Sequence, residues 1–296
     1  MDFKTELKKY QEQVNNELEK YLRKQDCPER ILNNAMEYSL MAGGKRLRPT
    51  LVLSTYKLFK ENLEAAMPYA ISIEMVHNAS LIHDDLPGID NDNLRHGKPT
   101  NHKQFNEATA ILAGDGLFNY AYIVISSDLL NTENENELKN KIKIFKEFSI
   151  ATDRMLAGEY LDTECEEKNI STEKLKYIHK NKTGAYLRLC ARMGAILGGA
   201  TESQLEKITN YAEKIGLAFQ IKDDILSEIG DEKITGKPVG NDKEKGKCTY
   251  VSEYGLEKSK EILHQITNEA ILELDEFGEK AEFLTNLARY IETRNK

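Results

Sequence analysis

An apolar helical stretch that ends in two adjacent aspartates is the feature that most constrains how this chain folds. The residues between Tyr69 and Ile82 are mostly apolar or small, and the stretch ends at Asp84 and Asp85. A helix that is apolar nearly all round is buried nearly all round. The sequence therefore predicts a central helix that places two carboxylates at one end of the core.

Further charged residues follow this helix at once. Asp90 and Asp92 come first, and then Arg95, His96 and Lys98. Carboxylates this close together raise one another's pKa unless a cation lies among them, so a divalent metal site is the simplest interpretation. Mg²⁺ combines few protein carboxylates with phosphate oxygens, and the basic residues suit such a phosphate. The alternative is a solvated acidic loop after a helix.

The same arrangement recurs far along the chain. An apolar helix that begins near Gln204 ends at Asp223 and Asp224, and a lysine-rich segment follows. This repetition favours two functional metal sites over a solvated loop. If the two helices face each other, their carboxylates would hold two or three Mg²⁺ ions, with Mn²⁺ as the alternative, around one diphosphate.

Two further segments are candidates for binding that diphosphate. In GGKRLRPT, Lys45, Arg46 and Arg48 follow a glycine pair that allows close backbone approach to an anion, although a solvated surface is the alternative. His77 lies two helical turns before Asp84, where it either packs in the core or reaches the same phosphate.

The second segment that could bind the diphosphate contains a lysine inside an apolar helix. Lys182 and Thr183 lie among apolar and small residues, so the lysine either meets a negative ligand or extends to the surface. Glu159 and Asp162, three residues apart, share a face of the preceding helix. No GxxxxGK[ST] nucleotide-binding loop is present.

Composition excludes several classes of protein. The 296 residues carry a formal charge of −8, which argues against a nucleic-acid partner. The four cysteines form no CxxC pair, which fits a reducing cytoplasm. The N-terminal residues are charged and no run of about 18 apolar residues occurs, so we expect neither a signal peptide nor a membrane span.

Apolar residues recur at helical spacing, and only 6 Pro and 18 Gly interrupt them, so we predict an all-α protein without strands. We expect a polar loop at 131–141 and a helix start capped by Ser171. The other predicted helices are Phe3–Gln25, Glu29–Met41, Leu51–Lys60, Glu64–Leu86, Asn106–Leu130, Lys141–Glu164, one from Gln204 to Asp224, and two pieces within Glu253–Lys296.

Five segments, in this order and at these separations, resemble the trans-isoprenyl diphosphate synthases, and above all the bacterial farnesyl and geranylgeranyl diphosphate synthases. The segments are GGKRLRP, SLIHDDLPGIDNDNLRHGKPTNH, HKNKTGA, FQIKDDIL and GKCTYV. The resemblance runs from about Met36 to the C-terminal helix. It implies an all-α, single-domain helical bundle over residues 1–296, with a deep central apolar cavity, that forms a homodimer.

The resemblance implies a role for each matching residue. The metal ligands are Asp84, Asp85, Asp90, Asp223 and Asp224. The ligands of isopentenyl diphosphate are Lys45, Arg48, His77 and His96. The ligands of the allylic diphosphate are Arg95, Lys182 and Lys237, and the residues that stabilise the allylic cation are Thr183 and Gln220. The residues expected to act in catalysis are Asp84, Asp85, Lys182, Thr183, Gln220 and Asp223.

The implied reaction is the Mg²⁺-dependent head-to-tail condensation of isopentenyl diphosphate with dimethylallyl, geranyl or farnesyl diphosphate. The product is C15 farnesyl or C20 geranylgeranyl diphosphate. In the family, a bulky aromatic residue five positions before the first Asp restricts the product to C15. Here the residue is Ala79, with Ser80 beside it, which favours C20. The alternative is that Ala79 only permits close helix packing.

Three residues depart from the family pattern. His96 replaces an Arg, Ser227 replaces the third Asp of the second motif, and Glu159 replaces a Gln. These changes keep open a non-catalytic or low-activity partner subunit of a prenyl synthase. A terpene cyclase is disfavoured by GGKRLRP and the second Asp pair, and a plain diphosphatase by the large apolar interior.

Overall fold

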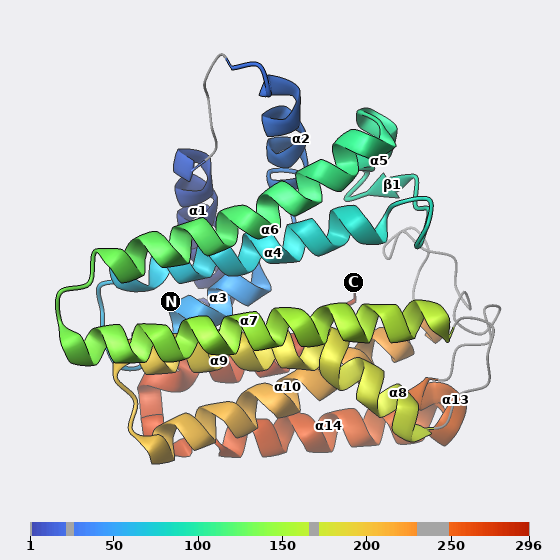
Figure 1. The fold of residues 1–296 in the computed structure, drawn as a ribbon. Helices are drawn as coiled ribbons and strands as arrows, with labels where there is room; N and C mark the ends of the chain where they lie inside the picture. The colour runs from blue at the N-terminus through green and yellow to red at the C-terminus, as the bar shows by residue number, and fades with distance from the viewer. Residues whose placement is uncertain (1, 22–26, 166–171, 230–248, 296) are drawn as a thin grey trace.

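The computed structural model describes residues 2–21, 27–165, 172–229 and 249–295, and it confirms the all-α fold. Helices account for nearly all of its regular structure (Figure 1). The helices in chain order are α1 Phe3–Tyr21, α2 Arg30–Leu40, α3 Leu47–Lys57, η1 Glu64–Ala66, α4 Met67–Asp84, α5 Asn101–Gln104, α6 Glu107–Leu130, α7 Glu135–Glu164, α8 Thr172–His179, η2 Lys180–Gly184, α9 Ala185–Gly198, α10 Glu202–Ile229, α13 Tyr250–Tyr254, α14 Leu256–Leu272, η3 Asp275–Ala281 and α15 Glu282–Thr293.

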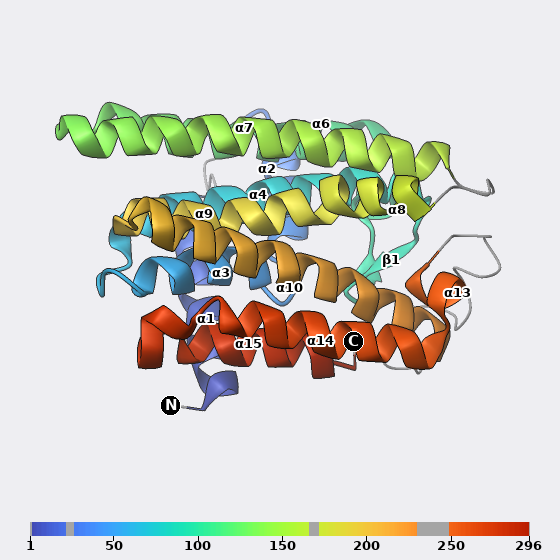
Figure 2. The same ribbon diagram turned by 90° about the horizontal axis from the view of Figure 1, so that it is seen from below.

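The long helices stack in layers. Figure 1 shows α4 and α6 side by side above α7 and α9, with α10 and α14 below them. Seen from below, α14 and α15 form the opposite face of the bundle from α6 and α7 (Figure 2). The C-terminal ends of α4, α7 and α10 lie at the same end of the bundle (Figure 1). Because the C-terminus of a helix carries partial negative charge, this end favours cations.

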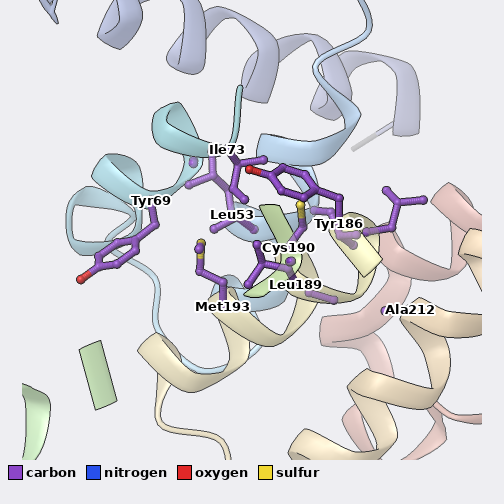
Figure 3. Close-up of a cluster of buried hydrophobic side chains, with 14 of the residues drawn as sticks. Leu53, Tyr69, Ile73, Tyr186, Leu189, Cys190, Met193 and Ala212 are labelled. Carbon is purple, nitrogen blue, oxygen red and sulfur yellow. The ribbon is translucent and has the colours of Figure 1, made fainter. Parts of the chain in front are cut away.

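Helix α4 is the central helix that the sequence predicts. Every residue from Tyr69 to Val76 is buried, which requires neighbours on all sides. Helix α6 covers one side of it, and α3 and α9 lie on the others. Figure 3 shows Tyr69 and Ile73 of α4 in the same cluster as Leu53 of α3 and Met193 of α9.

Two predicted helix starts are wrong. Helix α3 begins at Leu47 rather than Leu51, because Pro49 lies in the first turn, where its missing N–H costs nothing. Helix α7 begins at Glu135 rather than Lys141, because the Asn134 side chain accepts a hydrogen bond from the Glu137 N–H and caps the helix. The predicted polar loop is therefore much shorter than expected.

The prediction of no strands is also wrong, on a small scale. Leu94–Arg95 (β1) and Lys98–Pro99 (β2) form an antiparallel hairpin. His96 and Gly97 form its turn with φ of 52° and 77°, the left-handed conformation that two-residue hairpins require. The turn fixes the directions of Arg95 and His96.

Other differences lie near the ends of elements. The HKNKTGA segment contains a π-helical turn, η2, where an uninterrupted helix was expected. The C-terminal region forms α13, α14, η3 and α15 rather than two pieces. Ser171 and residues 22–25 of the first predicted helix lie outside the described residues.

Helix α6 is the one described helix long and apolar enough to cross a membrane, by length and composition only. One such helix is weak evidence for a membrane span, because the core helices of soluble proteins share these properties. Its inner face packs on α4 and α2. Its outer face leaves several apolar side chains exposed, namely Ile111, Leu112, Ile123 and Leu130.

Candidate active site

A cavity of about 530 Å³ lies at the end of the bundle where α4, α7 and α10 end. It collects residues from segments far apart in the sequence, and Leu81, Leu175, Ile178 and Phe219 give it an apolar portion. The predicted site residues that line it are Lys45, Arg48, His77, Asp84, Asp90, Arg95, His96, Lys182, Thr183, Gln220, Asp223 and Asp224. The structure therefore brings residues of both Asp motifs, though not Asp85, and all the described basic candidates to one site.

The carboxylate of Asp84 is half-buried. Its pKa is raised to about 7, chiefly by burial and then by the negative charge of Glu159, while Lys182 opposes the rise and Asp90 adds to it. No ion pair joins Asp84 to a cationic side chain among the described residues. The Asp90 N–H donates to the Asp84 carbonyl at 2.8 Å, which holds the second carboxylate close to the first.

Asp85 faces the hairpin instead. The Arg95 guanidinium donates to both of its oxygens, with Nε 2.8 and 2.9 Å and Nη2 2.6 Å away. Burial raises the pKa of Asp85, while the hydrogen bonds from Arg95 oppose that rise. The hairpin turn thus holds Arg95 so that it pairs with Asp85 and also lines the cavity.

The second Asp motif lies on α10 and is held by backbone and C-terminal groups. Arg294 Nη2 lies 2.5 Å from Asp223 Oδ1, and its guanidinium stacks 4.0 Å from the Phe219 ring centre. The Tyr250 N–H donates to Asp224 Oδ2 at 2.7 Å. Reasoning from the sequence missed Arg294, because a basic residue near the end of a chain carries no signal of its partner.

A group of basic residues, which we call the basic wall, consists of Lys45, Arg48 and His77. Arg48 Nη1 lies 3.3 Å from His77 Nε2, so the first turn of α3 meets α4 there. Burial, followed by the charges of Arg48 and Arg95, lowers the pKa of His77 well below its usual value, so its imidazole is neutral. His77 therefore contributes hydrogen bonding rather than charge to the wall.

Lys182 lies on the π-helical turn η2 and lines the same cavity. Its Nζ is 2.6 Å from Asp162 Oδ2 and 2.8 Å from Glu159 Oε2, and both carboxylates raise its pKa. Gly158 makes this geometry possible, because a Cβ at that position would lie 2.4 Å from the Lys182 backbone nitrogen. The lysine is thus paired and lines the cavity rather than extending freely to the surface.

The donor chemistry fits Mg²⁺. Within the described ranges, no group of three or more His, Cys, Asp or Glu side chains converges tightly enough to hold a metal by itself. Mg²⁺ typically takes one or two carboxylates and completes its shell with water and substrate phosphates. A divalent cation beside the half-buried Asp84 carboxylate would stabilise its charged form, which the raised pKa of about 7 shows to be disfavoured in the metal-free protein.

Four candidates lie away from the cavity surface or outside the described residues. Asp85 is buried against Arg95 and does not line the cavity, so its expected place among the metal ligands is not seen in this structure. Ala79 is fully buried in the core, and the Ser80 hydroxyl donates to the His77 carbonyl at 2.9 Å. Neither residue lines the cavity. Lys237 falls outside the described residues.

Glu74 is a cavity residue that the sequence reasoning missed. It is the one acidic residue between Tyr69 and Ile82, and its partner is the buried Arg46. A single carboxylate inside an apolar helix signals a buried partner, and that signal was available in the sequence.

Known proteins match most of the chain. The polyprenyl synthetase family model matches residues 29–285. A farnesyl diphosphate synthase of Geobacillus stearothermophilus is 43% identical over 262 residues, which are 87% of this chain and 86% of that protein. A chloroplastic geranylgeranyl pyrophosphate synthase of Capsicum annuum is 42% identical over 267 residues, which are 90% of this chain and 72% of that protein.

Solved structures share the fold over nearly their full length. An FPP/GFPP synthase of Zymomonas mobilis in its apo form gives a TM-score of 0.87 at 34% identity, covering 98% of this chain and 99% of that one. A geranylgeranyl pyrophosphate synthetase of Pyrococcus horikoshii gives a TM-score of 0.88 at 28% identity, covering 99% and 98%. The chain belongs to the polyprenyl synthetase family and is a prenyltransferase.

Proposed function

We propose that this chain joins isopentenyl diphosphate head-to-tail to dimethylallyl, geranyl and farnesyl diphosphates and releases diphosphate. The observation that carries the proposal is one cavity lined together by residues of both Asp motifs, by the basic wall and by Lys182. Ala79 favours C20 geranylgeranyl over C15 farnesyl diphosphate as the final product. The whole chain, residues 1–296, would form one catalytic domain in the cytoplasm.

The residues divide into two substrate subsites. The basic wall and His96 would bind the diphosphate of the isopentenyl substrate, while Arg95, Lys182 and Lys237 would bind that of the allylic substrate. Mg²⁺, two or three ions per site or Mn²⁺ in their place, would supply Lewis-acid neutralisation of the allylic diphosphate when bound. The residues that would hold these ions are Asp84, Asp85, Asp90, Asp223 and Asp224.

In the proposed reaction the allylic C–O bond breaks, the isopentenyl double bond attacks the allylic carbon, and a proton leaves to restore a double bond. The released diphosphate accepts that proton. Thr183 and Gln220 line the cavity, so their side-chain dipoles would stabilise the positive charge that develops on carbon. Leu81, Ile178 and Phe219 would exclude water, which would otherwise quench the cation.

We further propose a homodimer formed through α6. The outer face of this helix exposes four large apolar residues, and 56% of Leu112 and 87% of Leu130 are accessible. A second copy of the chain would cover this face, since a symmetric contact places the same apolar patch on both partners.

The test is condensation of labelled isopentenyl diphosphate with geranyl diphosphate in Mg²⁺. We expect Asp84→Asn and Asp223→Asn to lower the rate by about 100-fold or more, because each removes a negative charge that would hold the Mg²⁺ needed to neutralise the leaving diphosphate. Asp153→Asn is the matched control, because Asp153 is exposed on α7 outside the cavity. Equal rates for all three variants would contradict the assigned site.

A non-catalytic partner subunit is the second candidate, and Lys182 is the observation that favours it. Glu159 and Asp162 both hold this lysine, and the family's usual Gln would carry no charge at position 159. A folded wild-type chain that binds diphosphate in Mg²⁺ but forms no product would support this alternative.

A further inference from the structure

Arg46 and Glu74 form a buried ion pair directly beneath the basic wall. Arg46 Nη1 lies 2.6 Å from Glu74 Oε1, and only 2% and 4% of the two side chains are accessible. The other guanidinium nitrogens are also used, because Nε donates to Asn15 Oδ1 at 2.9 Å and Nη2 to the Leu40 carbonyl at 2.5 Å. One guanidinium therefore ties α1, the end of α2 and α4 together.

The backbone at this position is shaped to bury the arginine. Arg46 has φ of 50°, and the preceding Gly43 and Gly44 have φ of 113° and 114°. A residue other than glycine rarely adopts a left-handed conformation unless its surroundings determine it. This turn directs the Arg46 guanidinium to the buried Glu74, and Arg46 borders the cavity together with its neighbours Lys45 and Arg48.

The pair therefore links the two segments that make the basic wall. Lys45 and Arg48 flank Arg46 in the loop and first turn of α3, and Glu74 lies one helical turn before His77 on α4. Glu74 is itself fixed, because Asn78 Nδ2 donates to its Oε1 at 3.1 Å. A shift of the pair would change the distance between Arg48 and His77, which is 3.3 Å.

Stability alone is a poor explanation for this pair. A buried ion pair often costs as much in desolvation as it returns, and apolar residues of similar volume frequently stabilise a protein equally well. In addition, Glu74 Oε2 is buried without a hydrogen-bond partner among the described residues, which is a further cost. Such a cost is expected where geometry at a site matters more than stability.

We propose that Arg46 and Glu74 are positioning residues for isopentenyl diphosphate: they hold Lys45, Arg48 and His77 at the spacing that grips its phosphates. Neither needs to touch the substrate. The proposal rests on the function proposed above and assigns a role to two residues outside the expected set of substrate and metal ligands.

The test compares Glu74→Gln with Glu147→Gln. Glu147 is a matched control because Arg192 Nε and Nη2 each lie 2.7 Å from its carboxylate oxygens, in a partly buried pair between α7 and α9 outside the cavity. We expect Glu74→Gln to raise the KM for isopentenyl diphosphate by about tenfold or more, because small displacements of binding groups are costly. The KM for geranyl diphosphate should change less than about twofold in both variants.

A second variant guards against misfolding. The double variant Arg46→Met/Glu74→Leu leaves no unpaired buried charge, so it should retain its melting temperature within a few degrees and still show the raised isopentenyl KM. If the isopentenyl KM is unchanged in both variants, or if Glu147→Gln raises it equally, the pair has no positioning role. A wild-type enzyme without condensation activity would instead overturn the proposed function, so the two failures are distinguishable.

Discussion

His96 is the residue at which we expect this chain to differ most in binding chemistry from its family, whose motif implies an Arg at this position. It lies in the hairpin turn and lines the cavity near Gly44 and Arg46. Burial lowers its pKa, the positive charges of Arg95 and Arg46 lower it further, and Asp85 and Glu74 only partly oppose them. The imidazole is therefore neutral in the free protein at neutral pH, whereas an Arg would be charged.

A diphosphate bound beside His96 would favour its charged form and raise its pKa. The protein with a charged His96 therefore binds the diphosphate more tightly than the protein with a neutral His96. This gain in affinity is lost as pH rises from the His96 pKa of the free protein through the higher His96 pKa of the complex. We predict that the KM for isopentenyl diphosphate increases between about pH 6 and pH 9, while His96→Arg binds more tightly and flattens the profile. A flat profile in the wild type, measured by initial rates, would show that His96 does not contact this substrate.

At the scale of single elements, we propose that α4 sets product length. Ala79 is fully buried five residues before Asp84, and its methyl group takes far less volume there than an aromatic side chain would. We predict that Ala79→Tyr shifts the final product from C20 to C15, because one helical turn of about 5.4 Å is close to one isoprene unit.

The expected loss of stability for this variant is about 1–3 kcal/mol, because a larger side chain must be accommodated in a packed core. Chromatography of the dephosphorylated products measures the shift, with Ser80→Ala as the conservative control. An unchanged C20 product from the folded variant would mean that Ala79 serves only to pack α4 against its neighbours.

Helix α6 carries the prediction about assembly. Leu112 is 56% exposed on its apolar outer face, and Leu272 is 65% exposed on α14. We expect Leu112→Glu to convert the dimer to a monomer in light scattering, because it places charge in the centre of an apolar contact. Leu272→Glu should leave the dimer intact, and dissociation by both variants, or by neither, would argue against this interface.

At the scale of the whole molecule, the fold class could be predicted from the sequence, because the burial and periodicity of apolar residues are local signals. The apolar run of α4 predicts a buried helix, which the structure confirms, and the repeated Asp pairs predict acidic residues at two helix ends, which in the structure border one cavity. The hairpin was missed because each of its strands has only two residues, too few to show an alternating pattern. The start of α7 was missed because its cap, Asn134, lies in a polar segment that also suits a loop.

The contacts that arrange the site are long-range, which explains why they escaped prediction. Arg294 reaches Asp223 from the far end of the chain, and Arg46 reaches Glu74 from another helix. Such pairs require the tertiary arrangement to be known first. The residue types at the site were thus predictable from motifs, whereas their pairing was not.

The central claim is that this cavity lengthens an allylic diphosphate by isopentenyl units. The most direct measurement is incubation of the purified protein with labelled isopentenyl diphosphate, Mg²⁺ and, separately, dimethylallyl, geranyl or farnesyl diphosphate, followed by product-length analysis. We predict that all three primers are extended and that the products accumulate at C20, with none when Mg²⁺ is chelated. A folded protein that extends none of the three primers would contradict the account.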